Sequence, residues 1–243
     1  MKSLTVVLPY YMNQGMLIEQ IKIFNNYADS TKKRLELIVV DDYSPMGQRA
    51  EEILNKLKFK GYRFSLYKIL TDLRWNWLQC RNLGAKMADS DWLLLTDIDH
   101  ILTPERMDTL IDIELSHKSA YRFPRVNWAD NSYKDPHPNS WLMTKNRYWR
   151  IGGYDETYAG HYGTDGMWRD RIIESGTAIE MLVGCPLARV DRNDIPDAST
   201  VSLDRKANRA PGALEDIRAF KEKNEIGIQT LRFPWKLVYK AGY

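Results

Sequence analysis

Cysteine is almost absent from this chain of 243 residues. Its two cysteines, Cys80 and Cys185, lie far apart in the sequence and in no metal-ligand spacing. The number and spacing argue against a disulfide framework and against a thiolate metal site. We expect two reduced, partly buried thiols in a cytosolic protein.

Long apolar runs are also missing. No segment approaches the roughly eighteen apolar residues that a membrane-spanning helix needs. The apolar start from Leu4 to Tyr11 is too short for a secretion signal and contains Pro9. We therefore expect a soluble, unprocessed, cytoplasmic protein without a transmembrane segment.

The chain lacks both a strong charge of one sign and a glycine-rich phosphate loop. Its formal net charge of +3 is too small to indicate a nucleic-acid or membrane partner. Neither G-x-G-x-x-G nor G-x-x-x-x-G-K-[ST] occurs, which disfavours dinucleotide oxidoreductases and P-loop NTPases. The remaining composition, with 44% hydrophobic and 28% charged residues, is typical of a globular protein.

Hydrophobic periodicity predicts alternating strands and helices over the first hundred residues. Apolar runs between turn residues indicate four strands, at 4–8, 35–40, 62–70 and 92–95. Apolar residues at helical spacing indicate helices between them, at 16–27, 49–57 and 77–88. Since this alternation is typical of a parallel sheet with crossover helices, we expect an α/β fold.

The pattern becomes irregular in the second half of the chain. Thr103 and Pro104 predict the start of a helix over 105–116, whereas the segments after Tyr121 are short and aromatic. We expect one domain at 1–203, divided into halves at 1–102 and 103–203, and then a C-terminal helix and tail at 204–243.

Aromatic residues or carboxylates follow three of the predicted strands. These residues are Pro9-Tyr10-Tyr11, Asp41-Asp42 and Asp97-Ile98-Asp99. Because the carboxyl ends of parallel strands meet in one crevice, we expect them to lie together. Tyrosine can stack on a base, a carboxylate can accept hydrogen bonds from a base or a ribose, and paired aspartates suit a cation that also binds phosphates. The sequence therefore predicts a nucleotide-diphosphate site.

These motifs, taken in order, resemble those of family 2 glycosyltransferases, which have the GT-A fold. The resemblance runs from Leu4 to about Ile173. It is carried by the segments Val6-Val-Leu-Pro-Tyr-Tyr11, Leu37-Ile-Val-Val-Asp-Asp-Tyr-Ser44, Arg81-Asn-Leu-Gly-Ala85 with Trp92 to Asp99, and Gly152-Gly-Tyr-Asp-Glu156 with Gly163-Thr-Asp165. No segment is specific alone, and the order of all four carries the resemblance.

The resemblance implies a Rossmann-like, mostly parallel sheet sandwiched by helices, followed by an irregular acceptor-side half. It also implies a metal-dependent, inverting glycosyltransferase that uses a nucleotide-diphosphate sugar, with a UDP-sugar the expected donor. The acceptor hydroxyl could belong to a glycan, a lipid-linked saccharide, a protein or a modified nucleic-acid base.

Particular roles on the donor side follow from this resemblance. Pro9, Tyr10, Tyr11 and Asp42 would contact the base, and Arg81 would donate hydrogen bonds to the diphosphate. Asp97 would bind the ribose, and Asp99, with Asp97 as a second candidate, would bind Mn²⁺ or Mg²⁺. Each assignment has a structural alternative: the aspartates could form or cap turns, the tyrosines could be core residues, and Arg81 could lie on a solvated helix face.

Asp165 is the predicted general base on the acceptor side. Inverting transfer needs a carboxylate to take the proton of the attacking hydroxyl. In the related pattern an acidic residue often precedes this base, and here Thr164 stands there. If Asp165 were structural, Asp155 or Glu156 would be the next candidates.

The histidines and tryptophans give weaker signals. Many relatives supply a late histidine to the metal, but all four histidines here precede Asp165, so the diphosphate, water or Asp191 would complete the coordination. His161 is expected in the acceptor pocket or in packing. Three tryptophans could form either a sugar platform or part of the core: Trp141, Trp149 and Trp168.

Two other functions and one surface remain open. A non-catalytic nucleotide-sugar or glycan-binding protein would have the same fold, and a sugar-1-phosphate nucleotidyltransferase would have a similar sheet. The latter usually has a Gly-rich, Arg-containing loop where this chain has Pro9-Tyr10-Tyr11. The basic and aromatic residues at 232–240 could make a peripheral membrane contact or pack on the domain.

Overall fold

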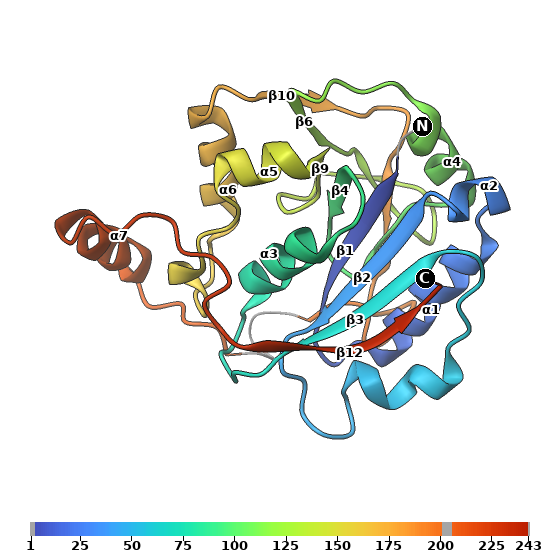
Figure 1. Cartoon of the computed structure of the whole chain (residues 1–243), viewed down its shortest axis with the longest axis horizontal. Coiled ribbons are helices and arrows are strands. Elements are labelled where there is room, and N and C mark those ends of the chain that lie inside the picture. The colour runs from blue at the N-terminus through green and yellow to red at the C-terminus, as the bar shows by residue number, and fades with distance from the viewer. Residues whose placement is uncertain (1–2, 201–205, 243) are drawn as a thin grey trace.

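The computed structural model describes residues 3–200 and 206–242, and a parallel sheet forms its centre (Figure 1). The four strands predicted in the first half all form: β1 (Leu4–Tyr10), β2 (Leu35–Asp41), β3 (Arg63–Ile69) and β4 (Trp92–Leu95). β1 pairs in parallel with both β2 and β4, and β2 pairs in parallel with β3. The predicted α/β fold is therefore confirmed.

Further strands extend this sheet on both sides. The added strands are β6 (Ser119–Arg122), β9 (Trp141–Thr144), β10 (Ala178–Met181) and β12 (Trp235–Ala241). The order is β10-β6-β9-β4-β1-β2-β3-β12, with β9 antiparallel to β4 and β12 antiparallel to β3. A four-stranded second sheet has the order β5-β11-β7-β8, formed by β5 (His100–Ile101), β7 (Arg125–Asn127), β8 (Tyr133–Lys134) and β11 (Leu187–Arg189).

Helices cover the two faces of the main sheet (Figure 1). One face packs against α1 (Gln14–Asn26) and α4 (Pro104–Asp112), and α2 (Asp29–Lys32) lies nearby. The other face packs against α3 (Trp77–Met87), α5 (Lys145–Ile151) and α6 (Asp165–Glu174). Val6 and Leu8 of β1 face the first core and Val7 faces the second, so this strand is buried on both faces, as its apolar run indicates.

The structure corrects the type of one predicted helix and the length of another. The segment 49–57 forms a 3-10 helix, η1 (Ala50–Lys56), in which the Ala50 N–H donates to the Asp41 carboxylate at 3.1 Å. The helix predicted over 105–116 ends at Asp112, because Ile113 has extended backbone angles. Both differences lie at helix ends or in short segments, where periodicity gives little guidance.

Gly84 allows α3 to lie directly on β1. A Cβ atom at this position would be 2.2 Å from Val7 Cγ1. The close approach brings the first turns of α3 to the end of β1, where Pro9 and Tyr10 lie. This glycine therefore serves the packing of α3 on the sheet.

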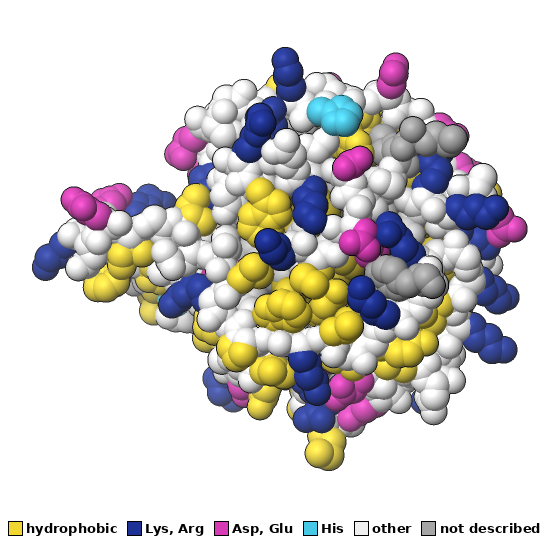
Figure 2. All heavy atoms as spheres, viewed as in Figure 1, with side chains coloured by type: hydrophobic (Ala, Val, Ile, Leu, Met, Phe, Trp, Pro, Cys, Tyr) yellow, Lys and Arg dark blue, Asp and Glu magenta, His cyan; other side chains and the backbone are white. Residues whose placement is uncertain are grey.

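The C-terminal segment forms a helix and then a strand rather than a tail. Helix α7 (Ala213–Lys223) protrudes from the body of the molecule, with hydrophobic side chains along one side (Figures 1 and 2). β12 then returns to the edge of the main sheet, where Trp235 packs on Tyr67 and Tyr239 on Phe59. These contacts agree with the packing alternative for 232–240, and membrane contact stays a prediction.

Two further expectations can be placed in the structure. Cys80 and Cys185 are buried and are not joined by a disulfide. Within the described ranges no helix is both long and apolar enough to cross a membrane. The proposed domain boundary between residues 203 and 204 lies outside the described residues.

Candidate active site

A cavity of about 490 Å³ opens at the carboxyl ends of the central parallel strands. Of the residues first assigned to the donor, the metal and the general base, all except Arg81 line it, namely Pro9, Tyr10, Tyr11, Asp42, Asp97, Asp99 and Asp165. The parallel register explains the convergence, since β1 ends beside Asp41 of β2 and beside the end of β4. The roles assigned to these residues remain predictions.

The two aspartates after β2 differ in their contacts. The Asp41 carboxylate accepts the backbone N–H groups of Ser44 and Ala50, at 2.7 and 3.1 Å, and so holds the turn. Asp42 lines the cavity, and its Oδ2 accepts the Asn76 N–H at 3.0 Å, which ties the start of α3 to the end of β2. Asp42 is thus the aspartate of this pair that a ligand could reach.

The two tyrosines after β1 also differ. Tyr10 is buried, and its hydroxyl donates to the Gln48 carbonyl at 2.7 Å. Tyr11 is half-buried and lies at the cavity wall. Tyr11 therefore has more aromatic surface available to a base than Tyr10 has.

Arg81 is wholly buried behind Asp97. Its guanidinium donates to the Asp97 carboxylate, to the Asn139 carbonyl and, at 3.1 Å, to the Tyr154 hydroxyl. The residue is not among the described residues that line the cavity. These contacts favour positioning of Asp97, whereas the sequence predicts direct donation to a diphosphate.

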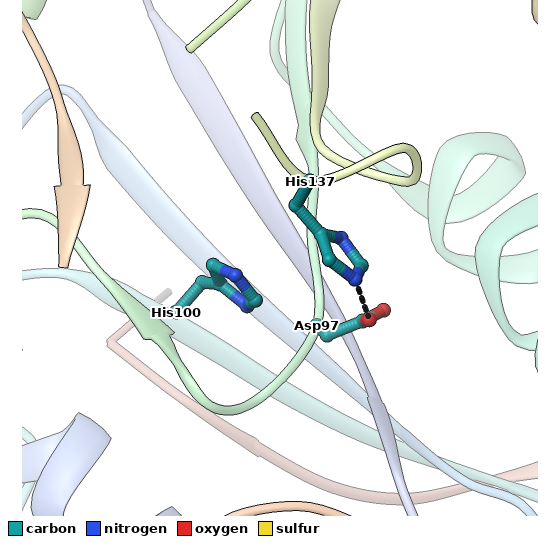
Figure 3. A group of neighbouring side chains, drawn as sticks. All are labelled: Asp97, His100 and His137. Carbon is teal, nitrogen blue, oxygen red and sulfur yellow. Dashed lines mark ion pairs between the residues drawn. The ribbon is translucent and has the colours of Figure 1, made fainter. Parts of the chain in front are cut away.

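Asp97 contacts both Arg81 and His137, and Figure 3 shows the contact with His137. Its Oδ1 contacts Arg81, and its Oδ2 lies 3.3 Å from His137 Nε2. Burial acts to raise the pKa of Asp97, but His137 and Arg81 together lower it below the usual range. Burial lowers the pKa of His137 to about 4, so this imidazole is neutral at neutral pH.

Asp99 points to a different partner. Its Oδ1 is 2.7 Å from His100 Nδ1, and both side chains are almost fully buried. His100 Nε2 is also buried and makes no hydrogen bond to any residue that the structure describes. Over residues 3–200 and 206–242, Asp97, His100 and His137 form the one group of metal-ligand side chains, with all three ligand atoms within 4.8 Å of one another (Figure 3).

Asp165 begins α6 on the opposite side of the cavity. Its Oδ1 accepts a hydrogen bond from the Asn139 side-chain amide. Burial, together with the nearby charge of Asp97, raises the pKa of Asp165 above the usual value. A half-buried carboxylate with a raised pKa and a neutral partner is suited to accept a proton.

The two other candidate bases hold the C-terminal segment in place. Asp155 forms an ion pair of 2.6 Å with Lys221 of α7. Glu156, in η2 (Glu156–Tyr158), is fully buried and accepts hydrogen bonds from the Asn82 amide and from two backbone N–H groups, at Leu231 and Arg232. Neither carboxylate is among the described cavity-lining residues.

Comparison with known proteins decides the family. Residues 5–168 match the family model described as glycosyl transferase family 2. The chain belongs to this family. It is 27% identical over 97 residues to the amylovoran biosynthesis glycosyltransferase AmsB of Erwinia amylovora, which covers 40% of this chain and 31% of AmsB. An uncharacterized glycosyltransferase of Haemophilus influenzae is 24% identical over 110 residues, or 45% of this chain and 34% of that protein.

Solved structures show that this family 2 chain has the GT-A fold. S. aureus TarS 1–349 in complex with UDP-GlcNAc matches with a TM-score of 0.62 and 13% identity, over 93% of this chain and 67% of that one. A Drosophila β1,4-galactosyltransferase 7 mutant in complex with manganese, UDP-Gal and xylobiose has a TM-score of 0.57 and 12% identity, over 90% and 80%. The chain spans about a third of the length of the curated relatives it matches.

The sequence of this family 2 chain does not predict several of the residues that line the cavity. His100 directly follows Asp99, but it precedes Asp165, whereas the family resemblance implies a metal-binding histidine after the base. His137 and Asn139 reach the site because β9 runs antiparallel to β4, with Trp141 opposite Leu95. That pairing brings the loop before β9 to the residues after β4, although some forty residues separate them in the sequence.

The aromatic residues near Asp165 also differ from the predicted platform. Trp141 and Trp168 are core residues, which agrees with the packing alternative, and Trp149 packs against the same core. Trp75 and Tyr162 line the cavity instead, with ring centroids 6.4 Å apart. His161 and Asp191 are not among the described lining residues, and Asp191 pairs with Arg189 at 3.1 Å.

Proposed function

We propose that this family 2 chain is a metal-dependent, inverting glycosyltransferase that uses a UDP-sugar. The observation that supports this most is the meeting of Asp97, Asp99 and Asp165 in one cavity at the carboxyl ends of β1, β2 and β4. A nucleotide sugar needs both a carboxylate group for its cation and a separate base for its acceptor. S. aureus TarS, which has the same fold, was solved with UDP-GlcNAc.

The donor would lie along the first strands. Asp42 and Tyr11, which line the cavity at the ends of β2 and β1, would contact the base and ribose. Asp97, held by the buried Arg81, would face the ribose and diphosphate. Bound Mn²⁺ or Mg²⁺ would offset the negative charge of the departing diphosphate, and the carboxylates and histidines after β4 are the residues available to hold it.

Asp165 would act as the general base. Its carboxylate takes the proton of the acceptor hydroxyl as the hydroxyl oxygen forms a bond to the anomeric carbon of the sugar. The bond between that carbon and the diphosphate oxygen breaks, and its electron pair leaves with the diphosphate. The raised pKa of Asp165, caused by burial and by Asp97, strengthens the carboxylate as a base.

The acceptor would be a saccharide, either a glycan or a lipid-linked sugar. Trp75 and Tyr162 line the same cavity as Asp165, and Tyr162 is 45% exposed. Aromatic rings of this kind present flat apolar faces with a polar edge, which suits the face of a sugar ring. Their position beside the proposed base supports a sugar hydroxyl as the nucleophile.

A donor screen tests the proposal. We expect a UDP-sugar with Mn²⁺ to raise the melting temperature by roughly 5–10 °C at a hundred times its Kd, and other nucleotide sugars to raise it less. Transfer to a saccharide should stop with a chelator and resume with Mn²⁺. Asp99→Ala should lose turnover at limiting Mn²⁺. No melting shift and no turnover with any nucleotide sugar would overturn the proposal.

A further inference from the structure

One ring nitrogen of His100, Nε2, is buried but takes part in none of the hydrogen bonds that hold the described residues of the site together. The side chain is 3% exposed, and this atom has no hydrogen-bond partner among the described residues. A buried polar atom without a partner is unfavourable, so such an atom in a cavity wall calls for a ligand. His100 is one of the residues that line the cavity, so its side chain lies beside the proposed donor site.

The contact on the other ring nitrogen sets the chemistry of Nε2. His100 Nδ1 lies 2.7 Å from Asp99 Oδ1, and an ionised carboxylate can only accept, so Nδ1 carries the proton. A neutral imidazole then has its lone pair on Nε2. Metal-binding histidines commonly donate their second nitrogen to a carboxylate in this way, which fixes the tautomer and the ring orientation.

Two further side chains with metal-ligand atoms lie close to His100. Asp97 and His137 each offer one atom, and together with His100 all three lie within 4.8 Å of one another (Figure 3). His137 Nε2 lies 3.3 Å from Asp97 Oδ2, and the Asn139 N–H donates a long hydrogen bond of 3.4 Å to His137 Nδ1. A cation on Nε2 would take the place of the contact with Asp97 and would move the ring proton to Nδ1, where it would displace the weak contact from Asn139.

We propose that Asp97, His100 and His137 bind the divalent metal through one oxygen and two nitrogens, and that Asp99 is a positioning residue for His100. The proposal rests on the proposed function and names the ligands of its metal. It differs from the prediction that Asp99 binds the metal directly. Two histidines and one carboxylate leave coordination positions open, which diphosphate oxygens and water can fill.

The chemistry of the ligands predicts which metals bind. Imidazole nitrogens favour first-row transition metals, whereas Mg²⁺ prefers oxygen ligands and loses its water reluctantly. We therefore expect the site to bind Mn²⁺ and Co²⁺ more tightly than Mg²⁺, and Co²⁺ more tightly than Mn²⁺.

Mn²⁺ alone, added to the full chain, is the probe. Pulsed electron paramagnetic resonance of the bound Mn²⁺ should show couplings to two histidine nitrogens. His100→Ala and His137→Gln should each remove one coupling and weaken Mn²⁺ binding, measured by calorimetry. His137→Gln guards against misfolding of the first variant, because His137 is only half-buried in a loop. His117→Gln is the matched control, since His117 is exposed and packs on Trp92 away from the site.

Asp99 variants separate an orienting carboxylate from a metal ligand. Asp99→Asn keeps an oxygen that accepts from His100 Nδ1, so it should stay near the wild-type affinity and keep both couplings. Asp99→Ala should lose about 10- to 100-fold in affinity, as outer carboxylates do. Equal, severe loss in both variants, or an absence of nitrogen coupling in the wild type, would overturn the proposal.

The result is distinct from a failure of the proposed function. Mn²⁺-dependent transfer without nitrogen coupling would support the proposed transferase function, but it would rule out the histidines as metal ligands. Nitrogen-coupled Mn²⁺ in a protein that turns over no nucleotide sugar would support the histidine ligands and rule out the proposed transferase function.

Discussion

The two sides of the cavity place their carboxylates in opposite environments. On the β4 side, Asp97 contacts the Arg81 guanidinium and His137, and its pKa is lowered despite burial. On the α6 side, the Asp165 carboxylate accepts a hydrogen bond from the neutral Asn139 amide, and burial raises its pKa. Carboxylates whose surroundings move their pKa values apart take different roles. The comparison therefore supports the proposal that Asp97 stays charged and that Asp165 transfers the proton.

Removal of the α6 carboxylate should have the largest effect. Asp165→Asn keeps the size of the side chain but cannot take a proton, so kcat should fall by about 10²- to 10⁴-fold. UDP binding in the presence of Mn²⁺, measured by calorimetry, should stay unchanged. Asp170→Asn is the control because Asp170 is exposed on the same helix. A normal kcat in Asp165→Asn would assign the base elsewhere.

Removal of the cation behind Asp97 should mainly lower stability. Arg81→Met leaves Asp97 without its buried partner, and breaking such a pair costs about 3 kcal/mol. Arg63→Met, which breaks the exposed Arg63–Asp89 pair, should cost less than about 1 kcal/mol. Urea unfolding compares the two variants. Equal losses in the free energy of unfolding would mean that the buried Arg81–Asp97 pair contributes no more to stability than the Arg63–Asp89 pair.

The acceptor side should respond separately from the donor side. Tyr162→Ala removes an aromatic ring that lines the cavity near Trp75, and we expect KM for the acceptor to rise about tenfold, since a lost ring contact is worth 0.5–1.5 kcal/mol beyond its buried area. KM for the UDP-sugar should not change. Steady-state kinetics with each substrate varied in turn gives both values, and a change confined to the donor KM would move this ring to the donor side.

The pH profile should show the smallest effect. Asp165 must be ionised to act, so kcat should fall as the pH drops through its raised pKa, at a higher pH than for an ordinary aspartate. Asn139→Ala removes a donor that lowers this pKa, so the acid limb should move to still higher pH. If the acid limb of the pH profile does not move in Asn139→Ala, a group other than Asp165 causes that limb.

The parts of this arrangement that depend on local sequence could be predicted. β1, β2 and β4 are continuous apolar runs, and the residues that follow them, such as Asp42 and Asp97, meet because parallel strands share an edge. The role of Asp165 is implied only by the family resemblance, because no local sequence pattern identifies a general base. Its place in the cavity agrees with that expectation.

The parts that depend on long-range pairing could not be predicted. His137 and Asn139 are near Asp97 only because β9 pairs with β4, and no local pattern states that pairing. The burial of Arg81 follows from contacts with Asn139 and Tyr154, which lie far along the chain. The sequence likewise predicts a tail where β12 forms, because this strand depends on pairing with the distant β3, and its register shifts between Leu237 and Tyr239.

The anomeric configuration of the product tests the division of roles most directly. If Asp165 takes the proton of a hydroxyl that attacks opposite the departing diphosphate, the reaction is a single displacement. Proton NMR of the product should then show the configuration opposite to that of the sugar in the UDP-sugar. A product with the same configuration as the donor would contradict the assignment of Asp165 as the base of an inverting transfer.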